Sequence, residues 1–306
     1  MGEHQIQDRI SEGEMRSFVR ALLEDVRALE IMLERGQIES GIRRIGAEQE
    51  MFLIDRGLRP VKAALPLLEA LASERFTTEL GQFNLELNLA PQELGGRCLS
   101  RLHKELDQGV EQVRLEASKL GVHVLLCGIL PTLGKQHLSL EWMTPKPRYL
   151  QLNDTMCRLR GGEFKTMIKG VDELQTTHDN VMLEACNTSF QVHFQVGAQE
   201  FAPLYNLAQA VTAPVLAAGV NSPVLLHHRL WRETRVALFQ QSLDVRSAAV
   251  TGRGGRQRVN FGEKWVERSV MEIFREDIAR FRLLLATDID EDPEAVLDRD
   301  GVPNLT

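Results

Sequence analysis

Residues 78–89 read T-E-L-G-Q-F-N-L-E-L-N-L, and from Phe83 onward apolar and polar side chains alternate without a break. Successive side chains of a β-strand point to opposite faces, so this period of two predicts a strand with one buried face and one polar face. The two acids of the stretch, Glu79 and Glu86, have opposite parity and would face opposite sides of an unbroken strand. A bulge at Gly81, or a strand that begins after Glu79, would remove this conflict.

Other stretches extend the predicted sheet and supply helices. Residues 42–55 and 188–196 alternate in the same way, and the nearly continuous apolar run at 122–130 fits a strand covered on both sides. Apolar residues spaced by three or four predict helices at residues 11–35, 65–72, 99–120, 200–219, 223–244 and 265–285. The expected fold class is therefore α+β, with a sheet whose apolar face is backed by helices and whose other face is polar.

The composition is that of an ordinary globular chain, with 306 residues of which 43% are hydrophobic and 26% charged. This length allows one large domain or two small ones. Acids outnumber bases by 43 to 36, which argues against a nucleic-acid partner held by a basic surface. No apolar run approaches the roughly 18 residues of a membrane helix, and the polar start lacks a signal core. The four cysteines form no C-x-x-C pair, so we expect a cytoplasmic protein with no membrane partner.

Carboxylates gather on the polar faces of the predicted strands. Glu48 and Glu50 are two residues apart, so they project from the same face of the first strand, about 7 Å apart. Two acids at this distance repel each other unless a positive group lies between them, and a divalent cation that prefers oxygen ligands is a natural partner. Exposed acids on a solvated strand face are the alternative. Glu86 and His193 occupy polar positions of the other two strands, which favours a cation site if the strands are neighbours.

Arginines supply the basic candidates. Arg229, Arg232 and Arg235 recur at steps of three on the helix predicted at 223–244 and would lie on roughly one face. Such a face could receive a carboxylate or a phosphate, or it could be a solvated surface paired with acids. The Gly/Arg stretch at 251–260 has two interpretations as well: a loop that closes over phosphates or a simple surface loop. The chain has no G-x-x-x-x-G-K-[ST] motif, so a nucleotide would be held through metal and arginine.

Four motifs together resemble those of the glutamate-cysteine ligase family, in particular its bacterial type 2 carboxylate-amine ligase branch. They are G-A-E-Q-E-M-F-L-I-D (46–55), E-L-G-Q-F-N-L-E-L-N (79–88), T-S-F-Q-V-H-F (188–194) and N-S-P-V-L-L…W-R-E-T-R (221–235). The resemblance implies a curved antiparallel sheet with helices on its outer face, similar to the catalytic domain of glutamine synthetase and guanidino kinases.

The same resemblance implies a division of the chain into two parts. Residues 1–40 would form an N-terminal helical segment, and residues 41–306 would form the catalytic domain. Members of the family normally continue past the position of Thr306 with a further strand of the active site. The resemblance therefore implies that the catalytic domain in this chain is incomplete at its C-terminal end.

The resemblance also implies a chemistry, in which ATP and Mg²⁺ are used to join the γ-carboxylate of glutamate to an amine, such as that of cysteine, through an acyl phosphate. The residues that match the family's magnesium ligands are Glu48, Glu50, Glu79 and Glu86. The polar residues assigned to the nucleotide or substrate are Gln191, His193 and Gln195. Arg232 and Arg235 resemble arginines near the substrate carboxylates.

Two other functions stay open at this level. One is a phosphotransferase on the same type of sheet, which would phosphorylate a small molecule without forming an amide. The other is a noncatalytic protein that binds a nucleotide or an amino acid. A homo-oligomer is open as well, because nothing in the motifs bears on subunit contacts.

Overall fold

The computed structural model describes residues 12–246, 257–284, 291–299 and 301–305. The strands are β1 (Arg44–Ile54), β2 (Phe76–Thr78), β3 (Asn84–Asn88), β4 (Gln92–Glu93), β5 (His123–Leu125), β6 (Phe164–Lys169), β7 (Glu173–His178), β8 (Phe190–Gln195), β9 (Val224–Leu225) and β10 (His228–Arg229). The α-helices are α1 (Glu12–Glu34), α2 (Ala64–Leu71), α3 (Cys98–Lys119), α4 (Pro147–Arg160), α5 (Phe201–Ala218), α6 (Arg235–Ser242), α8 (Met271–Arg280) and α9 (Pro293–Leu297). None of the described helices is both long and apolar enough to cross a membrane.

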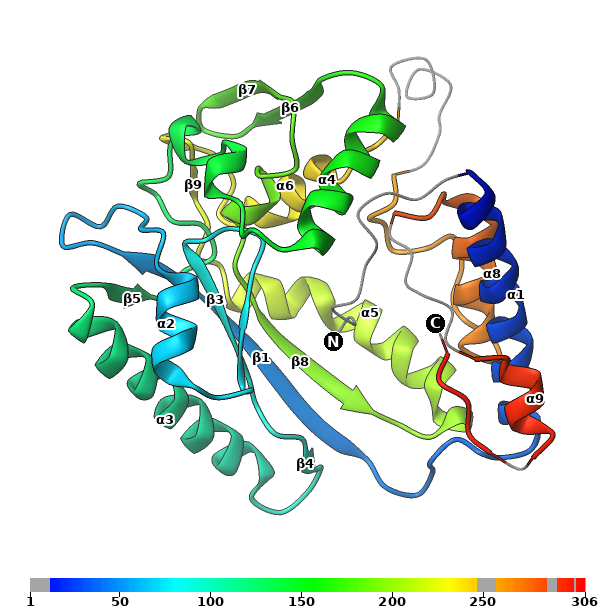
Figure 1. Ribbon diagram of the computed structural model, residues 1–306. Helices are drawn as coiled ribbons and strands as arrows, with labels where there is room; N and C mark the ends of the chain where they lie inside the picture. Colours follow the sequence, from blue (N-terminus) through cyan, green and yellow to red (C-terminus); the bar gives the residue numbers. More distant parts are fainter. Residues whose placement is uncertain (1–11, 247–256, 285–290, 300, 306) are drawn as a thin grey trace.

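The central strand β1 organises the main sheet. Along one edge it pairs with β3 and, at its start, with β4, while along the other edge it pairs with β8 and, at its end, with β5. All of these pairings are antiparallel, and β2 extends the sheet beyond β3. Figure 1 shows β1 running diagonally through the molecule with β8 beside it. The expected α+β class, built on an antiparallel sheet, is confirmed.

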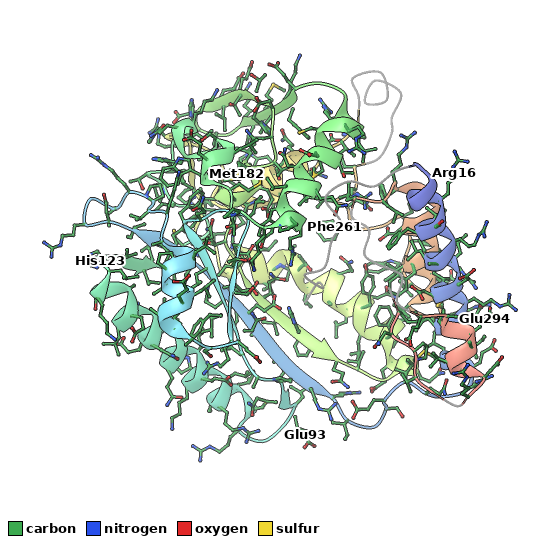
Figure 2. All side chains as sticks on the ribbon, in the orientation of Figure 1. Arg16, Glu93, His123, Met182, Phe261 and Glu294 are labelled. Carbon is green, nitrogen blue, oxygen red and sulfur yellow. The ribbon has the colours of Figure 1, made fainter. Side chains whose placement is uncertain are left out.

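The two faces of β1 pack against different layers. Met51 and Leu53 share one face with Leu85 and Leu87 of β3, and these side chains are buried against α2 and α3. Phe52, on the opposite face, belongs to a second core, which also contains apolar residues of α4, β6, β7 and α6, the layer at the top of Figure 1. Figure 2 shows Met182, which has no exposed surface, within this upper layer.

A third, small core lies at the opposite side of the molecule. Ala28 and Met32 of α1 pack against Leu297 of α9, and α1 also contacts α8. Figure 1 shows these three helices as one group, apart from α2 and α3. The apolar face of the helix predicted at 11–35 is therefore buried, in part, against helices from the C-terminal part of the chain.

The strand predicted at 78–89 is divided into two. β2 ends at Thr78 and β3 begins at Asn84, and the intervening turn forms a bridge from Gly81 to Met143. Glu79 therefore precedes the second strand, and the parity that would have separated it from Glu86 does not apply. Of the two arrangements that would remove the conflict, the structure adopts the one in which the strand begins after Glu79.

The single helix predicted at 223–244 is wrong. Val224–Arg229 forms a tight hairpin, in which Leu226 and His227 both have positive φ, at 47° and 67°. Positive φ at both central residues is the geometry of a type I′ turn, which matches the twist of paired strands and ends any helix there. Because Leu and His are unusual at such positions, the sequence carried no turn signal, and α6 begins only at Arg235.

Two other expectations need correction. Only the first part of the run predicted as a strand at 122–130 is extended, as β5, and Leu126 is 41% exposed. The apolar face of β8 was expected to be backed by helices, yet Phe190, Val192 and Phe194 are between 46% and 57% exposed. The reason is that α2 and α3 lie over β1 and β3, whereas β8 pairs with the other edge of β1.

The remaining differences concern the second half of the chain. The last predicted helix, 265–285, is shortened to α8, and the helix α4 and the hairpin β6–β7 were not predicted. In β6 and β7 buried and exposed residues alternate, a period-two pattern that the sequence does carry. Of the Gly/Arg stretch at 251–260, residues 251–256 lie outside the described residues.

Candidate functional site

Three carboxylates converge on the polar face of the sheet. One oxygen each of Glu50, Glu79 and Glu86 lies within 4.8 Å of the others, and all three residues are half-buried. Glu50 of β1 is directly opposite Glu86 of β3, so the pleat aims both side chains to the same face. Glu79 enters from the turn that follows β2. Two of these acids therefore come from adjacent strands, and the third comes from the break in the predicted strand.

Hydrogen bonds hold two of the carboxylates in place. The backbone N–H of Ser189 donates to Glu50 Oε2 at 2.7 Å, and the amide of Gln191 donates to Glu50 Oε1 at 3.2 Å. The amide of Asn88 donates to Glu86 Oε1 at 2.8 Å. β8 thus fixes the orientation of Glu50 from one side, while β3 orients its own Glu86.

The turn that carries Glu79 is tied to the segment before α4. The hydroxyl of Thr144 donates to the Glu79 carbonyl at 2.6 Å, and its N–H donates to the Leu80 carbonyl at 2.8 Å. The phenol of the buried Tyr149 donates to the Thr78 carbonyl at 2.9 Å. Bonds on both sides of Glu79 therefore determine where its side chain enters the site.

The pKa values show that the acids of this cluster are buried and repel one another. The pKa of Glu79 is raised to about 9, first by burial and then by the nearby charges of Glu50, Glu86 and Glu184. Burial also raises the pKa of Glu50, although the Ser189 N–H opposes this effect. Hard divalent cations prefer carboxylate oxygens, and one would balance these charges. The donor set therefore fits Mg²⁺ on both its chemistry and its electrostatics.

Sequence reasoning missed a fourth acid beside the cluster. Glu184 begins a short 3-10 helix (Glu184–Cys186), and burial together with the charge of Glu50 raises its pKa to about 7. No periodic pattern singles it out, because it lies in an irregular segment between β7 and β8. Only its electrostatic interaction with Glu50 and Glu79 in the folded chain reveals it.

The polar residues predicted on β1 and β8 occupy different places. Glu48 is absent from the described three-carboxylate group, and its Oε2 lies 3.5 Å from Nε2 of His193. Gln191 contacts Glu50, as described above. Gln195 instead bonds to Glu39 and Arg44, at the start of β1. Since Arg44 is six residues before Glu50, Gln195 lies about 20 Å along the strand from the cluster.

The predicted arginines do not share a helix face. Arg229, on β10, forms a bidentate ion pair with Asp172, at 2.9 and 3.1 Å. Arg232 is exposed, in the segment between β10 and α6. Arg235 is half-buried, where it forms an ion pair with Glu233 and donates to the Thr188 carbonyl at 2.8 Å. In this structure Arg235 therefore stabilises the segment that leads into β8.

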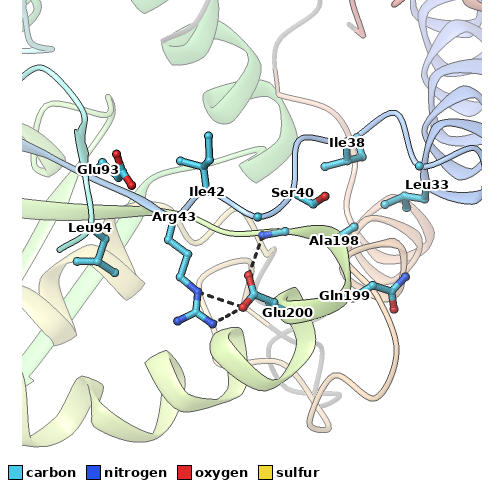
Figure 3. A pocket seen from close by; sticks show the side chains of 13 residues that line it. Leu33, Ile38, Ser40, Ile42, Arg43, Glu93, Leu94, Ala198, Gln199 and Glu200 are labelled. Carbon is cyan, nitrogen blue, oxygen red and sulfur yellow. Dashed lines mark hydrogen bonds and ion pairs between the residues drawn. The ribbon is translucent and has the colours of Figure 1, made fainter.

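A sizeable pocket lies away from the carboxylates. It has a volume of about 520 Å³ and is lined by the end of α1, the chain before β1 and the turn after β8. Figure 3 shows Arg43 paired with Glu200 at its wall, with Glu93 and Leu94 nearby. Because Arg43 and Glu200 already neutralise each other, this pocket is a weaker candidate for a catalytic site than the carboxylate cluster.

Comparison with known protein families gives a match that covers the site. A family model for glutamate-cysteine ligase family 2 matches residues 44–267, which is more than half of the chain. The matched range begins with β1 and includes all four acids of the site. No curated protein matches the chain.

Proposed function

The chain belongs to glutamate-cysteine ligase family 2, and from this premise we propose that it is an ATP- and Mg²⁺-dependent ligase that joins the γ-carboxylate of glutamate to an amine. Membership of this family supports a carboxylate-amine ligase activity. The proposed dependence on ATP and Mg²⁺ rests on the convergence of Glu50, Glu79 and Glu86, whose carboxylate oxygens fit a divalent cation. The antiparallel sheet that presents them supports a likeness to the glutamine synthetase catalytic domain.

The proposed reaction has two steps. The γ-carboxylate of glutamate attacks the γ-phosphorus of ATP, which forms an acyl phosphate and releases ADP. The amine then attacks the acyl carbon, loses a proton and expels phosphate, which leaves an amide. A magnesium ion held by the three carboxylates would neutralise phosphate charge, which otherwise repels the anionic nucleophile.

Neighbouring residues of the protein would orient the metal-binding carboxylates and position the substrates. Ser189 and Gln191 fix Glu50, and Asn88 fixes Glu86, so the carboxylates are oriented before any ligand arrives. Such preorganisation favours one geometry of the bound nucleotide. His193, beside Glu48, is proposed to face nucleotide or substrate, and the exposed Arg232 is proposed to receive a substrate carboxylate.

An ADP-release assay tests the proposal. Glutamate would be offered with a panel of amines that includes cysteine, and the product would be identified by mass spectrometry. We expect ADP only when both glutamate and an amine acceptor are present, and we expect Glu50→Ala and Glu86→Ala to abolish it. Glu163→Ala, which removes an exposed acid next to β6, is the matched control.

Other outcomes have distinct meanings. A phosphorylated product without an amide would identify a phosphotransferase instead. Nucleotide binding with no turnover for any amine would identify a noncatalytic binding protein. Activity that survived both Glu50→Ala and Glu86→Ala would contradict the assignment of the cation site.

A further inference from the structure

Two cationic side chains flank the start of α4, next to the carboxylate cluster. Lys146 is the residue immediately before the helix, and Arg148 is its second residue. The segment that carries them is fastened at both ends to the turn of Glu79. Thr144 bonds to the Glu79 carbonyl, and Tyr149 bonds to the Thr78 carbonyl. These two anchors hold Lys146 and Arg148 beside the acids.

Neither cation has a carboxylate partner among the residues that the structure describes, although both are half-buried. The guanidinium of Arg148 instead lies over the ring of Tyr149, 5.1 Å from its centroid. Arg229 and Arg246, in contrast, each form an ion pair with an aspartate. Half-buried cations that form no ion pair are available to an anionic ligand, because burial favours pairing of a charge.

The local electrostatics agree with this placement. Burial lowers the pKa of Lys146, Arg148 lowers it further, and Glu79 raises it. The Lys146 ammonium is therefore close to a second cation on one side and to the acid cluster on the other. With a divalent cation bound to the acids, this region would contain three neighbouring positive charges: the cation, Lys146 and Arg148.

We propose that Lys146 and Arg148 form an oxyanion subsite that takes phosphate oxygens of the nucleotide bound at the carboxylate cluster. The proposal deepens the proposed function and rests on it. Both side chains are suited to bind phosphate: the Arg148 guanidinium can form two parallel hydrogen bonds to it, and the Lys146 ammonium offers a compact positive charge. The N-terminus of the 14-residue helix α4 adds positive potential at the same place.

A triphosphate suits the subsite better than a substrate carboxylate does. A carboxylate carries one negative charge, whereas a triphosphate carries several and reaches across more than one positive centre. The acid cluster also needs a cation, and a cation that is shared with phosphate oxygens links the two halves of the site. The chain has no G-x-x-x-x-G-K-[ST] motif, so a triphosphate would need cations from elsewhere in the chain.

The test is a binding measurement on the full chain that needs no turnover. Isothermal titration with ATP, with tripolyphosphate and with glutamate, each in excess magnesium, would compare the wild type with Lys146→Met and Arg148→Met. Arg158→Met, at an exposed position near the C-terminal end of the same helix, and Lys135→Met, an exposed lysine, are matched controls. Circular dichroism and thermal unfolding establish that each variant is folded. Manganese binding, followed by electron paramagnetic resonance, reports on the acid cluster independently.

We expect each variant to bind ATP and tripolyphosphate about tenfold to a hundredfold more weakly, the usual effect of losing a hydrogen bond to a charged group. Glutamate and manganese binding should stay unchanged, and both controls should resemble the wild type. Wild-type affinity for tripolyphosphate in both variants would overturn the subsite and leave the ligase proposal intact. A loss confined to glutamate would also overturn it, because the cations would then hold a carboxylate. A wild type that binds manganese but no ATP would overturn both proposals.

Discussion

Glu50 and Glu86 lie directly opposite each other across the β1–β3 pair, with carboxylate oxygens within 4.8 Å. Like charges at paired positions of adjacent strands destabilise a sheet. The same geometry becomes favourable once a divalent cation lies between the two acids, because repulsion is replaced by coordination. The relationship therefore links folding stability to ligand binding.

The first prediction concerns Glu86→Gln. In the absence of divalent cations we expect the variant to be more stable than the wild type by about 0.5–1 kcal/mol, because one of two facing charges is removed. Added magnesium should stabilise the wild type and leave the variant unchanged. Urea unfolding with and without a chelator measures both effects. Glu163→Gln should behave as the wild type, and a variant that magnesium still stabilises would contradict the ligand role of Glu86.

The second prediction concerns pH. The pKa of Glu79 is raised from 4.5 to about 9, so the folded state holds a proton that the unfolded state releases. Without divalent cations, stability should therefore fall as pH rises from 4.5 through about 9, by at least about 1 kcal/mol. Glu79→Gln should flatten this dependence in chemical unfolding experiments. With magnesium present the slope should weaken or reverse, because the cation binds the deprotonated acid.

The third prediction concerns Glu184, whose pKa is raised to about 7 by burial and by the charge of Glu50. Its negative charge should assist cation binding from beside the three ligands. We expect Glu184→Gln to weaken manganese binding about tenfold, the usual effect of changing a group that supports metal ligands. Electron paramagnetic resonance measures this affinity directly. An affinity equal to that of Glu163→Gln would show that Glu184 has no part in the site.

The fourth prediction separates two arginines that were expected to act together. Arg235→Met should lower the free energy of unfolding by about 2–3 kcal/mol, because Glu233 loses its cationic partner and the Thr188 carbonyl loses its donor. Arg232→Met should change it by less than about 0.5 kcal/mol, since the side chain is exposed. Its effect should appear instead as a raised KM for glutamate. Equal stability losses would show that Arg232 also has a structural role.

Much of the sheet followed from alternation alone. The patterns at 42–55 and 188–196 became β1 and β8, and the face shared by Glu48 and Glu50 was correctly inferred. The long amphipathic helices also matched, as α1, α3 and α5 do. In β1, α1 and α3 the apolar period coincides with burial, whereas β8 and α5 follow the predicted period although most of their apolar side chains are exposed. The hairpin at Val224–Arg229 was not predicted, because its turn places Leu226 and His227 at positive φ, where the sequence gives no Gly, Asn or Asp as a signal.

The sequence by itself determined which side chains share a strand face, since the period of two is a property of the backbone. It thereby indicated the polar face and the acids Glu50 and Glu86. Only the tertiary structure decided which acids meet. It joins Glu79 to the cluster through a turn, leaves Glu48 beside His193, and brings Lys146 and Glu184 close from segments with no periodic pattern. The physical reason is that strand register and loop anchoring depend on hydrogen bonds between segments far apart in the chain.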